Sequence, residues 1–171
     1  PVTLGRGWAR PAEPSCGRGR IGEKPGSICR LKRVASDNRD EITALLPKAP
    51  REKNGKRIAC IGAGPASLTV ANDLLPLGYE VTIFEQYAVT GGLMRTNIPA
   101  FRLPANVLDE EIGDIVNMGA ELRLNSPVKS VRRLLESDKF DAIFVGSGAP
   151  KGKELDLPGR HATGRVHIGI T

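Results

Sequence analysis

One stretch decides the fold: residues 57–85 read RIACIGAGPASLTVANDLLPLGYEVTIFE. Residues 57–61 and 80–84 are rich in apolar, β-branched and aromatic residues, which is typical of buried strands. Between them, apolar residues recur at helical spacing until Gly78 ends the pattern. These residues are Leu68, Ala71, Leu74 and Leu75. The stretch therefore predicts a strand, a helix over residues 65–77 and a second strand.

The turn after the first strand carries the pattern GxGxxS at Gly62, Gly64 and Ser67. A first glycine permits a tight turn, a second lets backbone amides approach a pyrophosphate, and a small third residue lets the helix pack on the strand. The helix directs its N–H groups and the positive end of its dipole at phosphates. Pro65 suits its first turn, where no amide donor is needed, and Ala66 follows. The pattern predicts a dinucleotide site.

Glu85 follows the second predicted strand, 21 residues after Gly64. A carboxylate at this place accepts two hydrogen bonds from the diol of a ribose. Its negative charge also disfavours a 2′-phosphate. Glu85 therefore favours FAD or NAD over NADP.

Two later elements favour FAD over NAD. Gly91-Gly92-Leu93 would let the backbone pass close to a bulky ligand, and Arg102 supplies a cation for a phosphate or a flavin carbonyl. An NAD site needs neither element. An NAD-binding domain of a dehydrogenase stays open as an alternative that leaves both unexplained.

The rest of the chain continues the alternation of strands and helices. We expect a helix over residues 104–118, then strands at 121–124, 127–131 and 140–145, the last of them running into Gly146-Ser147-Gly148. This alternation predicts an α/β fold with a parallel, doubly wound sheet.

The N-terminal part differs in composition. Residues 1–26 hold six glycines and four prolines and predict a loop. Ser27 is placed to cap a helix, and a second short helix is expected over residues 37–46. A charged linker then separates an arm, residues 1–50, from a domain, residues 51–171.

Charge is uneven along the 171 residues, whose net charge is +6. Residues 1–57 carry 14 Lys or Arg and 6 Asp or Glu. Such an arm binds either nucleic acid or an acidic partner surface. We favour the acidic partner, because the arm has no aromatic residue beyond Trp8 to stack bases.

Other bulk features limit the function classes. No apolar run reaches the roughly 18 residues of a membrane span. Three cysteines form no disulfide framework, which indicates a reducing compartment, the cytoplasm, and Cys60 reads as a buried, inert thiol. Because the chain begins without methionine and stops inside an apolar stretch, we expect a piece of a longer protein.

Several motifs in order resemble one known family. GAGPAS at 62–67, Glu85, GGL at 91–93, IPAFRLP at 98–104 and FDAIFVGSGAPKGKELDLPG at 140–159 look like the FAD domain of the glutamate synthase small-subunit family. Dihydropyrimidine dehydrogenase shares this module. Residues 1–46 resemble, more loosely, the family's helical, ferredoxin-like iron–sulfur domain.

The resemblance implies a role for each matching residue. Glu85 would bind the adenosine ribose, Arg102 would contact the cofactor, and Val128 would present its backbone to adenine, although a core valine is an almost equal alternative. Gly92 and Leu93 would line the path to the flavin, and Gly148 would lie where the chain returns to the cofactor. The pyrophosphate would be cradled by Gly62, Gly64, Pro65, Ala66 and Ser67.

The arm departs from the family at its cysteines. Relatives ligate [4Fe–4S] clusters with cysteines four residues apart, and here those places hold Trp8, Ala12 and Cys16. Cys16 alone cannot close a cluster, because such clusters take four thiolates or substitutes. Cys29 could substitute, but we place it on the core-facing side of its helix. We prefer a degenerate vestige to a cluster completed by missing residues or another chain.

The resemblance implies part of a flavoprotein that takes a hydride from NAD(P)H and passes electrons to iron–sulfur carriers. The NAD(P)H domain would lie outside this sequence, so this piece by itself is expected to be inactive. The implied partner is an electron-acceptor subunit or iron–sulfur protein in a hetero-oligomer. A non-catalytic docking module with structural or lost FAD stays as the alternative. No residue is assigned as catalytic.

Overall fold

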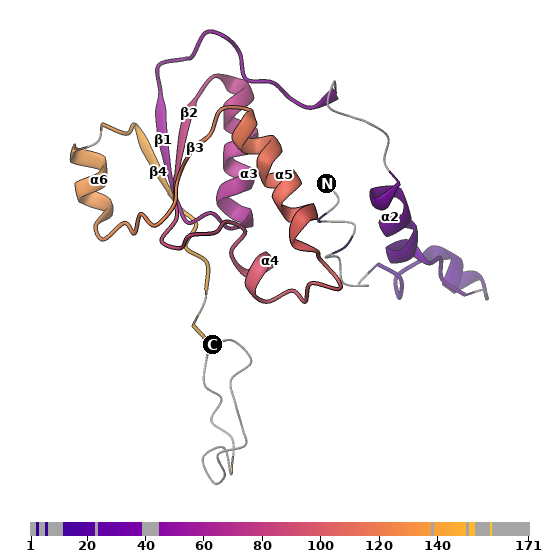
Figure 1. Ribbon diagram of the computed structural model, residues 1–171. Helices are drawn as coiled ribbons and strands as arrows, with labels where there is room; N and C mark the ends of the chain where they lie inside the picture. The colour runs from indigo at the N-terminus through magenta and orange to yellow at the C-terminus, as the bar shows by residue number, and fades with distance from the viewer. Residues whose placement is uncertain are drawn as a thin grey trace.

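The computed structural model describes residues 12–22, 24–38, 45–137 and 139–149, with residues 3, 6, 151, 152 and 158. Its strands form a four-stranded parallel sheet in the order β3-β2-β1-β4, drawn in Figure 1. They are β1 (Arg57–Ile61), β2 (Glu80–Phe84), β3 (Glu121–Arg123) and β4 (Ala142–Val145). The chain runs from β1 outward to β3 and then returns to the other side of β1, as in doubly wound folds. The predicted α/β class is confirmed.

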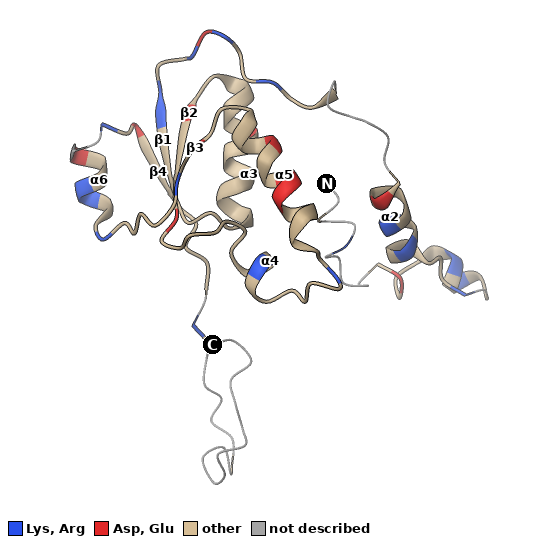
Figure 2. Cartoon of the chain, viewed as in Figure 1, with Lys and Arg blue, Asp and Glu red and all other residues tan. Residues whose placement is uncertain are grey.

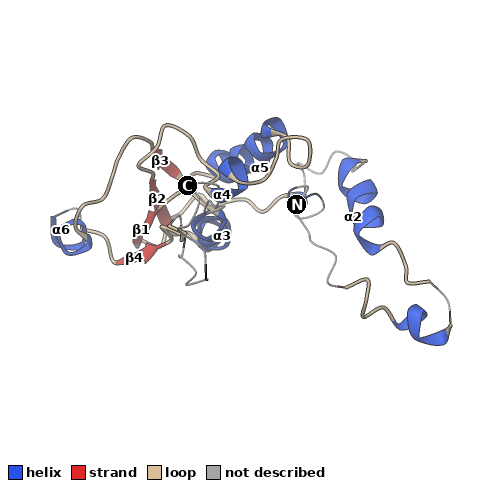
Figure 3. Ribbon diagram, turned by 90° about the horizontal axis from the view of Figure 1, so that it is seen from below, coloured by secondary structure: helices blue, strands red, loops and turns tan. Residues whose placement is uncertain are grey.

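Helices cover both faces of this sheet (Figure 3). α3 (Pro65–Leu74) and α5 (Ala105–Asn117) lie on one face, and α6 (Val131–Ser137) lies on the other. α4 (Leu93–Thr96) follows the loop after β2. None of the helices in the described part of the chain is long and apolar enough to cross a membrane.

The strands alternate between two cores, because successive side chains of a strand point to opposite faces. Ile58 and Cys60 of β1 join the core under α3 and α5, while Ala59 joins a smaller core under α6. The larger core also buries Leu75, Ile83 and Leu108. Burying each such side chain stabilises the fold by about 1.5–3 kcal/mol relative to exposure.

The helix predicted over residues 65–77 is α3 followed by a 3₁₀ turn, η3 (Leu75–Leu77). Pro76 has no N–H to continue the α-helical bonding. Gly78, with φ of 85°, ends the element as predicted. The helix expected over residues 104–118 is confirmed as α5, with Pro104 and Met118 at its two caps.

The strand predicted over residues 127–131 is wrong. Residues 127–130 are loop, and α6 begins at Val131. Val131, Leu134 and Leu135 have helical spacing, and Leu134 packs in the core with Phe84 and Phe140. Phe140, expected to start the last strand, precedes β4 and meets Phe84 edge to face at 6.0 Å. Tertiary packing therefore decides this segment.

The described part of the arm holds two short helices, η1 (Gly17–Ile21) and α2 (Ile28–Asp37). Ser27 occupies the N-cap position of α2 but makes no side-chain cap bond. α2 buries none of its residues, so the expected core-facing side is wrong, and Cys29 is half-buried. Of the second helix predicted over residues 37–46, residues 39–44 lie outside the described part.

Two polar contacts from the N-terminus link α2 and α5. Arg6 forms an ion pair with Asp37 of α2 at 2.9 Å, and the Thr3 amide donates to Glu111 Oε2 at 3.2 Å. Figure 2 shows basic residues on α2 and η1 and acidic residues along α5. Thr3 therefore contacts the acidic helix α5, and Arg6 contacts the basic helix α2.

Candidate functional site

The loops after β1 and β4 touch at the carboxyl edge of the sheet. The Gly62 amide donates to the Phe84 carbonyl at 2.7 Å, and the Gly146 amide donates to the Ile61 carbonyl at 2.8 Å. A Cβ on Gly62, whose φ is 92°, would lie 2.6 Å from the Gly146 carbonyl oxygen. Gly62 therefore makes the predicted tight turn and also lets β4's exit loop approach. This edge, where the strand order reverses, is where ligands of doubly wound folds bind.

Ser67 occupies the third position of the GxGxxS pattern. It is fully buried, and a Cβ on Gly146 would collide with its Oγ atom. A small residue is thus required where α3 passes the loop after β4, as the pattern predicts. The Ser67 hydroxyl has no hydrogen-bond partner within the described structure.

The N-terminus of α3 opens toward free space. Gly64 is its N-cap, Pro65 is its first residue, and both Pro65 and Ala66 are exposed. The first amides of any α-helix lack acceptors within the helix. A Cβ on Gly64 would meet no atom within 4 Å, so the space in front of this loop is open. These features fit a pyrophosphate.

Glu85 lies directly after β2. Its side chain is turned to the loop from Gly62 to Ser67, which we call the glycine loop. It is 5% exposed. Its Oε2 accepts a hydrogen bond from the Ala63 amide at 2.7 Å, and its Oε1 accepts one from the Tyr87 amide at 3.0 Å. An ionised carboxylate has about four acceptor sites, so two remain for ribose hydroxyls.

The two glycines after β2 bring a second loop against the first. The Gly91 amide donates to the Ala63 carbonyl at 2.8 Å. Gly92 has φ of 51° and ψ of −137°, and a Cβ there would lie 3.1 Å from the Gly64 Cα atom. The sequence predicts that these glycines let the backbone pass close to a ligand. In the structure they let it pass close to the backbone of Ala63 and Gly64.

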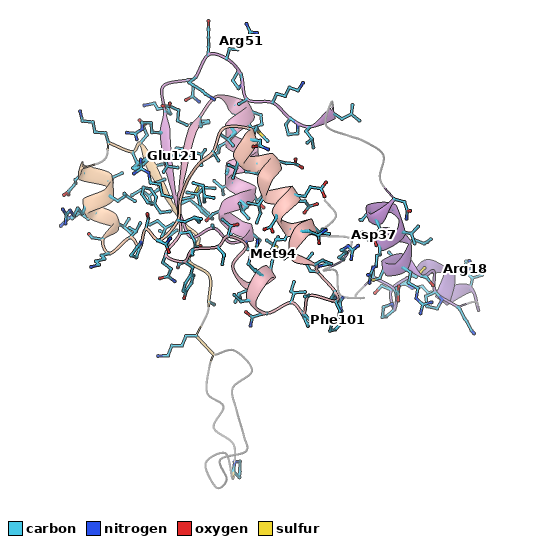
Figure 4. The ribbon with its side chains drawn as sticks, viewed as in Figure 1. Arg18, Asp37, Arg51, Met94, Phe101 and Glu121 are labelled. Carbon is cyan, nitrogen blue, oxygen red and sulfur yellow. The ribbon has the colours of Figure 1, made fainter. Side chains whose placement is uncertain are left out.

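Three other predicted positions are exposed on the surface. Leu93 begins α4 and is partly exposed, and Gly148 is exposed with φ of 69° in the segment after β4. Arg102 is exposed, and its Nε donates to the Arg6 carbonyl at 3.2 Å. Figure 4 shows the neighbouring Phe101 in the loop between α4 and α5, and Met94 of α4 packs against the larger core. The structure therefore places Arg102 against the arm.

A cavity of about 420 Å³ adjoins the carboxyl end of β2 on the α6 side. The Ser126 amide donates to the Glu85 carbonyl at 2.8 Å, which joins this cavity to the site. Its volume is within the range of small-molecule pockets. It is lined by Phe84, Ser126, Pro127, Val128, Lys129, Ser130, Arg133 and Leu134.

The cysteines differ in their surroundings. Hydrogen bonds from the backbone amides of Gly26 and Arg18 lower the pKa of the half-buried Cys16 thiol. Burial raises the pKa of Cys60 to about 11, which confirms it as a buried thiol. Within the described ranges, no group of three or more His, Cys, Asp and Glu residues could hold a metal ion.

Comparisons with known proteins agree with this geometry. Residues 60–120 match the family described as NAD(P)-binding Rossmann-like domain. The chain is 40% identical over 151 residues to a PreT homologue, a subunit of NAD-dependent dihydropyrimidine dehydrogenase from Salmonella typhi. It is 34% identical over 169 residues to the small chain of NADPH glutamate synthase from Mycobacterium tuberculosis. The chain is homologous to both proteins.

A third relative is the β subunit of NADP-dependent formate dehydrogenase from Moorella thermoacetica, 32% identical over 186 residues. The three alignments cover 86%, 98% and 91% of this chain. They cover only 36%, 34% and 25% of the relatives. The resemblance to the glutamate synthase and dihydropyrimidine dehydrogenase group is thus confirmed, and this chain spans about a third or less of each relative.

Sequence reasoning missed some partners within the site. It assigned Glu85 to a ribose but not to the amides of Ala63 and Tyr87. It also noted Gly146 after the last strand without predicting its contact with Ser67. Backbone partners leave no side-chain signature, so no residue pattern could have identified them.

Proposed function

We propose that this chain is the FAD-binding part of an NAD(P)H-dependent flavoprotein oxidoreductase that passes electrons through FAD to iron–sulfur carriers. The observation that carries the proposal is the open loop at Gly64, backed by the buried carboxylate of Glu85. The three relatives are all subunits of oxidoreductases, which supports it. Because the chain spans about a third or less of each relative, the activity of a whole protein is part of the proposal.

The cofactor would lie along the carboxyl edge of the sheet. The loop from Gly62 to Ser67 would hold the pyrophosphate, Glu85 the ribose, and the cavity beside Val128 the adenine. Gly92, Leu93, Arg102 and Gly148 would border the path to the flavin. FAD supplies hydride acceptance and one-electron release, while the protein binds and orients it. No acid–base residue of this chain is needed for that chemistry.

Absorbance of the purified protein tests the proposal. We expect a flavin band at about 450 nm, or its recovery after incubation with FAD. The matched control is Gly64→Val, which places a branched side chain where the phosphates would approach. A wild-type protein that stays colourless with excess FAD would contradict the proposal.

An NAD-binding domain is a second candidate, because the matching family model is described as NAD(P)-binding. Thermal unfolding with FAD or with NAD separates the two. A ligand at 100 times its dissociation constant adds about 2.7 kcal/mol to stability. Stabilisation by FAD alone supports our proposal, and stabilisation by NAD alone supports the second candidate.

We propose an electron-acceptor subunit or iron–sulfur protein as the partner, in a hetero-oligomer. The relatives named as a small chain and a β subunit support this. The basic arm would bind an acidic surface of that partner. If NADH and NADPH both fail to bleach the bound flavin of the full-length protein, a non-catalytic docking module is the correct description.

The arm's own donor set does not close a [4Fe–4S] cluster, since Cys16 stands alone among the three matched positions. We therefore propose a vestigial cluster site. Iron and sulfide determination on protein purified without oxygen tests this, and four irons per chain would contradict it. All three cysteines lack disulfides, which supports a reducing compartment such as the cytoplasm.

A further inference from the structure

Ala63, at the centre of the glycine loop, has both of its backbone polar groups hydrogen-bonded. Its N–H donates to Glu85 Oε2 at 2.7 Å, and the Ala63 carbonyl accepts from the Gly91 amide at 2.8 Å. Ala63 itself is fully buried. The loop that would face the phosphates is therefore fixed by two hydrogen bonds with the segment that follows β2.

Glu85 also joins this loop to two other turns. Its second carboxylate oxygen accepts from the Tyr87 amide at 3.0 Å, and its backbone carbonyl accepts from the Ser126 amide at 2.8 Å. Three chain segments that follow three different strands thus meet at one residue. Hydrogen bonds to an ionised carboxylate are stronger than those between neutral groups.

We infer that Glu85 is a positioning residue for the pyrophosphate loop, in addition to being the ribose acceptor. Its carboxylate holds the Ala63 amide while the Gly91 amide holds the Ala63 carbonyl, so the direction of the following Gly64 peptide is set before any ligand arrives. Recognition of the ribose and of the pyrophosphate is then coupled through one side chain. This inference rests on the proposed function for its ligand, but its structural part concerns the ligand-free protein.

The isosteric change Glu85→Gln separates the two roles. A carboxylate accepts at both oxygens, whereas a glutamine amide accepts at one atom and donates at the other. Glutamine can therefore satisfy either Ala63 or Tyr87, but not both. The matched control is Glu80→Gln, the same change at the other, exposed end of β2.

The first experiment compares inorganic pyrophosphate with ADP, titrated by NMR. Pyrophosphate reaches the loop but has no ribose. We expect Glu85→Gln to weaken pyrophosphate and ADP binding by tenfold or more, and Glu80→Gln to change neither. A loss of ADP binding with unchanged pyrophosphate binding would show a ribose contact only and overturn the inference.

The second experiment needs no ligand and measures amide hydrogen exchange. In the wild-type protein the Ala63 amide should exchange as slowly as the Cys60 amide of β1. In Glu85→Gln it should exchange at least tenfold faster while Cys60 keeps its rate, which separates local positioning from general destabilisation. A rapidly exchanging Ala63 amide in the wild-type protein overturns the inference even if the variant does not fold.

The two experiments also separate this inference from the proposed function. If the wild-type protein binds neither FAD nor ADP, the proposed function fails, and the exchange of Ala63 still decides whether Glu85 holds the loop. If FAD binds and Ala63 is unprotected, the function stands and the positioning role fails.

Discussion

Gly146 and Ser67 pack so closely that a side chain on Gly146 would collide with the Ser67 hydroxyl oxygen. One residue follows β4 and the other lies in the first turn of α3, 79 positions earlier. The contact seats the N-terminal end of α3 against the loop after β4. Small residues at both positions are thus a condition for the shape of the site.

The first prediction concerns this contact. Gly146→Ala should lower the free energy of unfolding by about 1–3 kcal/mol, because the new methyl group overpacks a buried contact. Denaturant unfolding measures this. Combining it with Ser67→Gly should recover part of the loss, since residues in contact are energetically coupled. Additive effects of the two changes would contradict the packing argument.

The second prediction concerns Gly92, whose φ and ψ are 51° and −137°. Gly92→Ala should cost about 1–3 kcal/mol, because residues with a Cβ are strained in this region. The new Cβ would also press on the Gly64 Cα atom, so FAD binding should weaken. Gly113→Ala, in α5 with nothing within 4 Å of the new Cβ, is the control and should not destabilise the protein.

The third prediction is a pH dependence at the other end of β1. The pKa of Asp141 is lowered by hydrogen bonds from the Lys56 ammonium, 2.8 Å from the carboxylate, and from the Arg57 amide. A carboxyl group whose pKa is lowered on folding stabilises the folded state at pH values above its unfolded pKa. This contribution is lost as the pH falls through its folded pKa. The stability advantage of wild type over Asp141→Asn should therefore shrink below about pH 4.

The same pair has a second limb at high pH. Asp141 raises the pKa of Lys56, so this contribution is present below the lysine's unfolded pKa and is lost at more alkaline pH.

Denaturant unfolding of the wild-type protein and of Asp141→Asn between acid and neutral pH checks the acid limb. A constant difference across that range would contradict it.

The fourth prediction concerns thiol reactivity. The thiolate is the nucleophile, so the lowered pKa of Cys16 and the raised pKa of Cys60, about 11, order their rates of alkylation. We expect iodoacetamide to label Cys16 well before Cys60 in the native protein at neutral pH. Peptide mass spectrometry measures the order, and in denaturant the difference should disappear. Early labelling of Cys60 would show that β1 is not buried as described.

The sequence by itself determined the strand–turn–helix–strand unit from Arg57 to Glu85. Its signals are local: Gly62 for a positive φ, Pro65 for a first helical turn, Gly78 for a helix end, and apolar residues with periods of two and 3.6. Such preferences act within a few residues, so they can be read without knowing the fold. The α/β class followed from their alternation.

Tertiary structure decided what lies between distant segments. Residues 127–131 have strand-like composition, yet no strand forms there, and α6 begins at Val131. The helix forms because it buries Leu134 against Phe84. The backbone partners of Glu85 and the contact of Gly91 with Ala63 depend on which loops the parallel sheet brings to one edge. Backbone amides carry no residue identity, so the sequence could only propose candidate residues for the site, and the fold shows which of them contact one another.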